Sequence, residues 1–178
     1  MSWKDFQHLD DESLLEYYHA TRNPNAFRQL YTRHKDSLYR YCAQMNLACA
    51  GAVLEALWNR LLESPPQLHG RRLRSWIFIR ANQLLRQYAG QDPDTPDAAP
   101  VSDNKLLAAI QQLPTIERNV LLLHMECGLP LATVADIEKT SLKKCREFYN
   151  RGKERLEEIL HGPQRQPWRI EEVSEVTV

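Results

Sequence analysis

Long apolar runs are missing from the sequence, and their absence excludes several classes of protein. The longest apolar stretches are a few residues, whereas a membrane-spanning helix needs about 20. The N-terminal segment, residues 1–12, is acidic and has no apolar core of the kind that signal peptides carry. We therefore expect a cytoplasmic protein that does not bind membranes.

Closely spaced metal ligands are also missing. The four cysteines lie far apart without a Cys-x-x-Cys pair; they are Cys42, Cys49, Cys127 and Cys145. Structural zinc sites normally use ligands that come in close pairs. The run 124–127 contains histidine, glutamate and cysteine, but its residues would point to different faces of a helix. We expect reduced thiols, no metal and no other cofactor.

Catalytic signatures are not found either. The chain has no glycine-rich phosphate loop, no His-Glu-x-x-His and no Gly-x-Ser-x-Gly. The six histidines are dispersed, and two of them, His34 and His124, fall within apolar helical patterns that favour a structural role. We predict no catalytic residues, and an unrelated helical enzyme is the least favoured hypothesis.

Proline, aspartate, alanine and glycine gather in one segment, AGQDPDTPDAAPVSDN, at residues 89–104. This composition is typical of a flexible linker. It divides the chain into a first module, residues 1–88, and a second module, residues 105–160. The remaining tail, residues 161–178, is expected to be either disordered or a short extended segment.

Apolar residues recur at helical spacing in both modules, and strand patterns are absent. We predict helices in the first module near residues 14–18, 27–45, 50–62 and 73–88. In the second module we predict helices near 106–113, 116–123, 131–138 and 142–160. The predicted fold is all-α: two small helical modules joined by a flexible linker.

The formal net charge is zero, but the charges are unevenly distributed. Residues 71–86 include five arginines and no acid, and residues 139–155 include seven basic residues against two glutamates. Four aspartates lie in the linker. Because a protein contacts nucleic acid through one face, such local excess outweighs the total.

Residues 128–156 have the pattern of a helix-turn-helix, a DNA-binding motif. Ala135 is small enough to let two helices approach closely. The second helix has an apolar side formed by Leu142, Cys145, Tyr149, Gly152 and Leu156. Its polar side consists of Ser141, Lys143, Lys144, Arg146, Glu147, Asn150 and Arg151, which could reach bases or phosphates in the major groove. The alternative is an amphipathic helix whose charged face is only solvated.

Over about residues 10–160 the chain resembles the extracytoplasmic-function sigma factors. In the second module, LLAAIQQLPTIERNVLLLHMECGLP has the family's Leu-Pro and following Arg at Leu113, Pro114 and Arg118, and its Gly-Leu at Gly128 and Leu129. The helix-turn-helix aligns without a gap at Val134, Ala135, Ile137, Arg146, Arg151 and Leu156. Lys139 replaces a turn glycine, so we expect it to take positive φ.

The first module resembles the family in layout, but its chemistry is degenerate. AFRQLYTRHKDSLYRYC is similar to the helix that opens the polymerase-binding region, and LRSWIFIRANQLLRQY to the promoter-melting helix. The resemblance assigns polymerase binding to Glu55, Trp58 and Asn59, and DNA binding to Arg71, Arg72, Arg74, Trp76, Arg80 and Asn82. The family's acidic Ala-Glu-Asp-x-x-Gln motif is replaced by residues 50–55, of which only Glu55 is charged.

The resemblance implies an RNA polymerase sigma factor that directs promoter recognition and transcription initiation. Its partners would be core RNA polymerase and promoter DNA, and an anti-sigma factor is a further partner that the resemblance allows. The alternative is a sigma-like DNA-binding regulator or protein-interaction module that no longer supports initiation.

Overall fold

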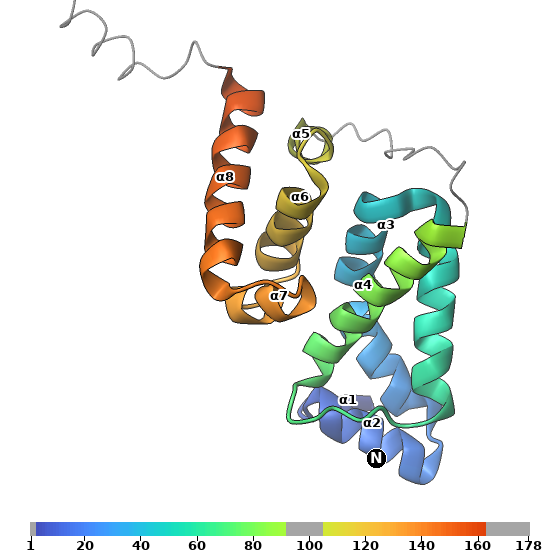
Figure 1. Cartoon of the computed structure of the whole chain (residues 1–178). Helices are drawn as coiled ribbons and strands as arrows, with labels where there is room; N and C mark the ends of the chain where they lie inside the picture. The colour runs from blue at the N-terminus through green and yellow to red at the C-terminus, as the bar shows by residue number, and fades with distance from the viewer. Residues whose placement is uncertain (1–2, 92–104, 163–178) are drawn as a thin grey trace, which may run out of the picture.

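The computed structural model describes residues 3–91 and 105–162, and these residues form helices without any strand. The elements are α1 (Trp3–Phe6), α2 (Asp11–Thr21), α3 (Pro24–Glu63), α4 (Leu73–Gln91), α5 (Lys105–Gln111), α6 (Thr115–Leu121), the π-helical turn η1 (Leu122–Glu126), α7 (Leu131–Ile137) and α8 (Leu142–His161) (Figure 1). The predicted all-α class is confirmed. No helix among the described residues is long and apolar enough to cross a membrane.

Helix α3 folds back on itself as a hairpin (Figure 1). The break is at Asn46, whose φ of −160° and ψ of 97° are not helical. The Asn46 side chain accepts a hydrogen bond from the backbone N–H of Cys49 at 3.4 Å, so it caps the second arm. Arg22, which lies between α2 and α3, donates to the carbonyl of Leu62 near the end of the second arm at 2.9 Å. The separate helices predicted at 27–45 and 50–62 are these two arms.

Helix α4 packs across the α3 hairpin and closes the core of the first module (Figure 1). Its spacing of apolar residues puts Ile77, Phe78 and Ala81 on the buried side. The Phe78 ring meets the ring of Tyr41 edge to face, with centroids 5.7 Å apart. The core also contains Leu14, Leu30, Leu38, Val53, Leu57, Leu61 and Leu73, all fully buried.

In the second module, α5 to α8 pack around apolar residues that belong to the same buried cluster as those of the first module, and the ends of these helices follow local sequence signals. Pro114 and Pro130 precede α6 and α7, and the Ser141 hydroxyl caps α8 by accepting from the Lys144 N–H at 3.1 Å. Gly128, with φ of 69°, ends the π-helical turn. The second module contributes to this cluster Ile110, Leu113, Val120, Leu121, Leu122, Leu123, Leu129, Val134 and Ile137.

The module boundaries differ slightly from the predicted ones. Helix α4 continues to Gln91, three residues into the predicted linker, and α8 includes His161. The rest of the linker, 92–104, and the tail from 163 lie outside the described residues. The short helix α1 was not predicted, because four residues give no periodicity. It places Phe6 fully buried against Tyr17.

Candidate nucleic-acid interface

Helices α7 and α8 form the helix-turn-helix. Ala135 is buried on α7, as the motif requires for close approach of the two helices. In the turn, the N–H of Thr140 donates to the carbonyl of Ala135 at 3.0 Å, and that of Lys139 to Asp136 at 3.3 Å. This pair of bonds is the Schellman arrangement, which puts one residue in the left-handed region. That residue is Lys139 with φ of 53°, so the predicted positive φ is confirmed.

The buried side of α8 holds the helix against α6 and α7. Cys145, Gly152 and Leu156 are buried, and Tyr149 is half-buried against the ring of His124. The fifth predicted anchor, Leu142, is 38% exposed, so that prediction is wrong. Leu142 is the first residue of α8 and precedes the turn in which Cys145 packs on the backbone of Leu131.

Close packing between α6 and α8 depends on a glycine. A Cβ at Gly152 would lie 3.1 Å from Cδ1 and 3.2 Å from Cγ of Leu121. Beside this contact, Arg155 Nε lies 3.1 Å from the carboxylate of Glu117, whose side chain is only 5% exposed. Arg155 therefore adds an ion pair between α8 and α6 beside the close contact at Gly152.

The polar face of α8 is exposed along its first two turns. All seven residues that the sequence placed there are exposed: Ser141, Lys143, Lys144, Arg146, Glu147, Asn150 and Arg151. Within the described residues, no ion pair or hydrogen bond engages the side chains of Lys143, Lys144 or Arg146. The structure thus brings these cations together on one accessible surface, where they can meet an anionic ligand.

The predicted DNA-binding residues of the first module are arranged differently. Arg72 is exposed, Trp76 is half-buried, and Arg80 donates to Gln83 at 3.2 Å. Arg71 and Arg74 both contact the second module: Arg71 pairs with Asp136 at 2.6 Å, and Arg74 donates to the carbonyl of Cys127.

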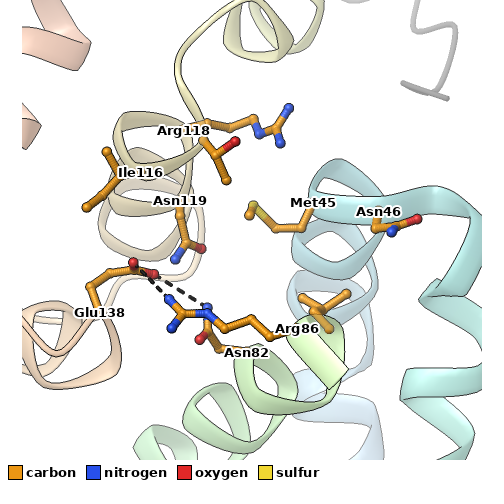
Figure 2. A pocket seen from close by; sticks show the side chains of 10 residues that line it. Met45, Asn46, Asn82, Arg86, Ile116, Arg118, Asn119 and Glu138 are labelled. Atoms are coloured by element: carbon orange, nitrogen blue, oxygen red, sulfur yellow. Dashed lines mark hydrogen bonds and ion pairs between the residues drawn. The ribbon is translucent and has the colours of Figure 1, made fainter. Parts of the chain in front are cut away.

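The sixth of these residues, Asn82, lies inside the interface between the modules. It is 5% exposed and donates to the hydroxyl of Tyr41 at 3.0 Å and to Glu138 at 3.4 Å. Figure 2 shows that the side chains of Asn82 and Arg86, both on α4, are directed at the carboxylate of Glu138. In this arrangement Asn82 would reach DNA only after the modules separate.

Three residues in this interface were missed by sequence reasoning: Tyr41, Asn119 and Glu138. Tyr41 donates to Asn119 at 2.7 Å, and both side chains are buried. Burial raises the pKa of Glu138 above its usual range, although Arg86 and Asn82 act in the opposite direction. In the sequence, these polar residues lie among apolar ones, which indicates that they are buried. This position does not indicate which polar groups contact each other. A pocket of about 360 Å³ lies between the modules here (Figure 2).

The predicted polymerase-binding residues lie on the second arm of α3. Glu55 and Asn59 are exposed, and Trp58 is half-buried with its ring edge-on to Tyr31, centroids 5.0 Å apart. A hollow of about 380 Å³ opens beside them. Two exposed aromatic residues at this hollow, Tyr31 and Tyr39, had not been assigned to the site from sequence.

Comparison with known proteins agrees with this architecture. The family described as sigma-70, region 4, matches residues 103–156. The fold is similar to that of the sigma factor RpoE from Bartonella quintana, solved in complex with the anti-sigma factor NepR. The TM-score is 0.61 at 16% identity, over 75% of this chain and 96% of that one. It is also similar to CnrH, solved with the cytosolic domain of CnrY: the TM-score is 0.61 at 21% identity, over 86% and 98%.

No curated protein matches the sequence significantly. The region 4 match covers α5 to α7 and most of α8, which includes the helix-turn-helix described above. The likeness to the solved structures extends the comparison to the first module at the level of fold. Residues 103–156 thus match sigma-70 region 4, and the fold is similar to that of two sigma factors, as the resemblance implied.

Proposed function

We propose that the chain is an RNA polymerase sigma factor of the extracytoplasmic-function type, directing promoter recognition and transcription initiation. The observation that carries this proposal is the recognition helix α8. It belongs to a sigma-70 region 4 and presents Lys143, Lys144 and Arg146 to solvent without partners in the described residues. In helix-turn-helix proteins the second helix lies in the major groove, where exposed basic side chains reach bases and phosphates.

Helix α8 would contact DNA in two ways. Lys143 and Lys144, near the capped start of the helix, are suited to phosphates, because a flexible ammonium group binds as a point charge. Arg146 lies mid-face, where its planar guanidinium could donate two hydrogen bonds to a guanine edge. Asn150 and Arg151, one turn further along, would extend the contact.

The first module would bind polymerase and the upstream promoter element. Glu55, Trp58 and Asn59 provide a charged, an aromatic and an amide group on the second arm of α3. The segment before α4 carries Arg71 and Arg72, and the first turn of α4 carries Arg74; these arginines would meet phosphates, and Trp76 would stack on an unpaired base. Because polymerase supplies the chemistry, the chain itself needs no cofactor and no catalytic residue. We propose that it acts in the cytoplasm.

An anti-sigma factor is a further proposed partner. RpoE was solved with the anti-sigma factor NepR, and CnrH with the cytosolic domain of CnrY. A chain of the same fold could be held inactive by a protein of the same kind.

The second candidate is a sigma-like DNA-binding regulator that no longer supports initiation. The observation in its favour is the surface of α3 where the family has an acidic motif. Here Ala50 is buried, and Gly51 and Ala52 are exposed. None of these three residues has a carboxylate, and Glu55 is the one charged residue of the stretch 50–55. Fewer carboxylates would weaken the grip on a basic polymerase surface.

In vitro transcription on genomic fragments, with purified core polymerase, tests the first proposal. We expect promoter-specific transcripts that depend on the added protein. Retention of the protein by immobilised core polymerase separates the candidates: a factor that binds DNA but neither binds polymerase nor yields transcripts is the regulator.

A further inference from the structure

We infer that the pocket between the modules is a binding site for a small organic anion, an apolar body that carries one carboxylate. The pocket has a volume of about 360 Å³ and is lined by residues of α3, α4 and α6 and by Glu138, which follows α7 (Figure 2). Small-molecule sites usually measure about 300–1,000 Å³ and combine mostly apolar walls with a few placed polar groups. The inference goes beyond the proposed function, because promoter recognition requires no such ligand.

The polar end of the pocket is Arg118 on α6, a buried cation. Arg118 is 7% exposed, and no carboxylate within the described residues forms an ion pair with it. Its Nη1 donates to the side-chain oxygen of Gln111 at 3.0 Å. Its Nε is buried and has no hydrogen-bond partner in the described part of the chain. A charge removed from water is costly unless it is paired and hydrogen-bonded, so this guanidinium lacks both a counter-charge and an acceptor.

Two buried glutamates of the second module are each engaged by another arginine. The carboxylate of Glu117, which is adjacent to Arg118 in the chain, lies 3.1 Å from Nε of Arg155 on α8. The carboxylate of Glu138, which also lines the pocket, lies 3.1 Å from Nη2 of Arg86. Because these two pairs balance their own charges, the pocket keeps the positive charge of Arg118. A carboxylate from a ligand would neutralise that charge and accept a hydrogen bond from the guanidinium.

The guanidinium is held in place before any ligand binds. Gln111, which accepts from Arg118, donates through its own side-chain amide to the backbone carbonyl of Gln44 at 2.7 Å. Gln111 ends α5, and Gln44 lies on α3 with its side chain buried. This series of hydrogen bonds runs from α6 through α5 to α3 and fixes Arg118 at the boundary of the two modules. A pre-organised group loses little conformational entropy on binding, which favours affinity.

The apolar wall of the pocket consists of Met45, Leu85 and Ile116, one residue each from α3, α4 and α6. Leu85 is buried, and Met45 and Ile116 are half-buried. Figure 2 shows Met45 extending from α3 towards α6, and its flexible thioether can adapt to the shape of a ligand. The pocket volume is that of roughly a dozen water molecules in the liquid. One cation beside three apolar side chains suits an aryl or alkyl carboxylate, whereas an inorganic anion would leave the apolar wall without a partner.

The test titrates the full-length chain with phenylpropanoate and with heptanoate, and with the neutral amide of each, by isothermal titration calorimetry. The amides have the shape of the acids without the charge. Because ligands of this size bind weakly, the titration extends to about 10 mM. We expect saturable binding of at least one carboxylate, about tenfold or more tightly than its amide. The bound carboxylate should also raise the unfolding temperature as its concentration increases, because it binds the folded chain.

Arg118→Gln removes the charge and keeps a side-chain amide at this position. Its matched control is Arg28→Gln, which removes a charge from an exposed position of α3 outside the pocket. Arg118→Gln should weaken carboxylate binding about tenfold or more and leave amide binding unchanged, whereas Arg28→Gln should change neither. If Arg118→Gln does not fold, ¹H–¹⁵N spectra of the unmodified chain locate the site. The backbone amide signals of Met45 and of residues 115–119 should then shift with added carboxylate.

Three results would overturn the inference. The first is that neither carboxylate binds saturably. The second is equal affinity for acid and amide, which would mean that the pocket accepts apolar groups without recognising an anion. The third is carboxylate binding that is unchanged in Arg118→Gln, or that shifts signals at Arg71 and Arg72 instead of those at the pocket. All binding is measured without DNA or polymerase, so the result is independent of whether the chain supports transcription.

Discussion

Tyr41 donates its phenolic hydrogen to Asn119 at 2.7 Å, although 78 residues separate them in the chain. The hydroxyl also accepts from Asn82 at 3.0 Å. One buried group therefore connects α3 and α4 of the first module to α6 of the second. Because burial raises the pKa of Tyr41, the phenol stays protonated and keeps its role as donor.

Tyr41→Phe should keep the ring in the core and remove this connection. It leaves the buried amides of Asn82 and Asn119 short of a partner, so we expect a loss of about 1–3 kcal/mol in the free energy of unfolding. The measurement is denaturant unfolding followed by circular dichroism. Tyr39→Phe, at a ring that is 53% exposed on the same helix, should change stability by less than about 0.5 kcal/mol. Equal effects of the two substitutions would contradict the assignment.

At Gly152, α8 lies so close to Leu121 that there is no room for a side chain. Gly152→Ala would place a Cβ 3.1 Å from Leu121, and we expect a loss of about 1–3 kcal/mol from overpacking. Because α8 would be displaced, DNA binding should fall as well.

Gly51→Ala is the matched control for this substitution. Gly51 is also helical, but nothing lies within 4 Å of a Cβ built there. Alanine should therefore leave stability unchanged or raise it by up to about 1 kcal/mol through helix propensity. Thermal unfolding of the two variants distinguishes packing from propensity, since propensity alone favours alanine at both positions.

The helices and the turn chemistry could be predicted from the sequence, whereas the interface between the modules could not. Lys139 illustrates the first case, because its positive φ follows from a local motif with a fixed hydrogen-bond pattern. Asn82 illustrates the second: family resemblance assigned it to DNA, but the structure buries it against Tyr41 and Glu138. Periodicity reports which residues face inward, but not which distant polar groups they meet.

Lys139 has a strained backbone, and this gives a third prediction. With φ of 53°, Lys139→Gly should relieve strain and stabilise the chain by about 0.5–1 kcal/mol, after the entropy that glycine adds to the unfolded state. Lys139→Ala retains the Cβ and should bring no such gain. Thermal denaturation of both variants is the measurement. A gain from alanine equal to that from glycine would mean that the side chain, not the backbone, is responsible.

Asp11 links α2 to α3 through a buried histidine, and its charge should make stability pH-dependent. It accepts from Nε2 of His34 at 2.8 Å and from Arg33 at 3.1 Å. Burial alone raises the pKa of Asp11, but these hydrogen bonds and charges outweigh it and hold the pKa below its ordinary 3.8. The resulting stabilisation is fully present above pH 3.8 and is lost as the pH falls through the lowered value.

Asp11→Asn should therefore cost about 1–3 kcal/mol at neutral pH and remove this part of the acid dependence. Unfolding measured from pH 7 downward gives the comparison. Glu16→Gln, at an exposed position of the same helix, should leave both stability and its pH profile nearly unchanged. A parallel pH profile for Asp11→Asn and the unmodified chain would show that the carboxylate does not contribute.

The last prediction concerns the exposed cations of α8. Lys143→Ala and Lys144→Ala should weaken binding to selected and random duplex DNA alike, and each should lower the salt dependence by about one unit, because each lost phosphate contact releases about one counterion fewer. Arg146→Ala should cost about 1–3 kcal/mol on selected DNA and relax the preference at one base pair. Lys153→Ala is the control, because its ammonium group lies over the Tyr149 ring, 5.3 Å from the centroid. Binding is measured across a salt series with each variant shown to be folded. If all three variants bind selected DNA as tightly as the unmodified chain, the polar face of α8 is only solvated and does not read promoters.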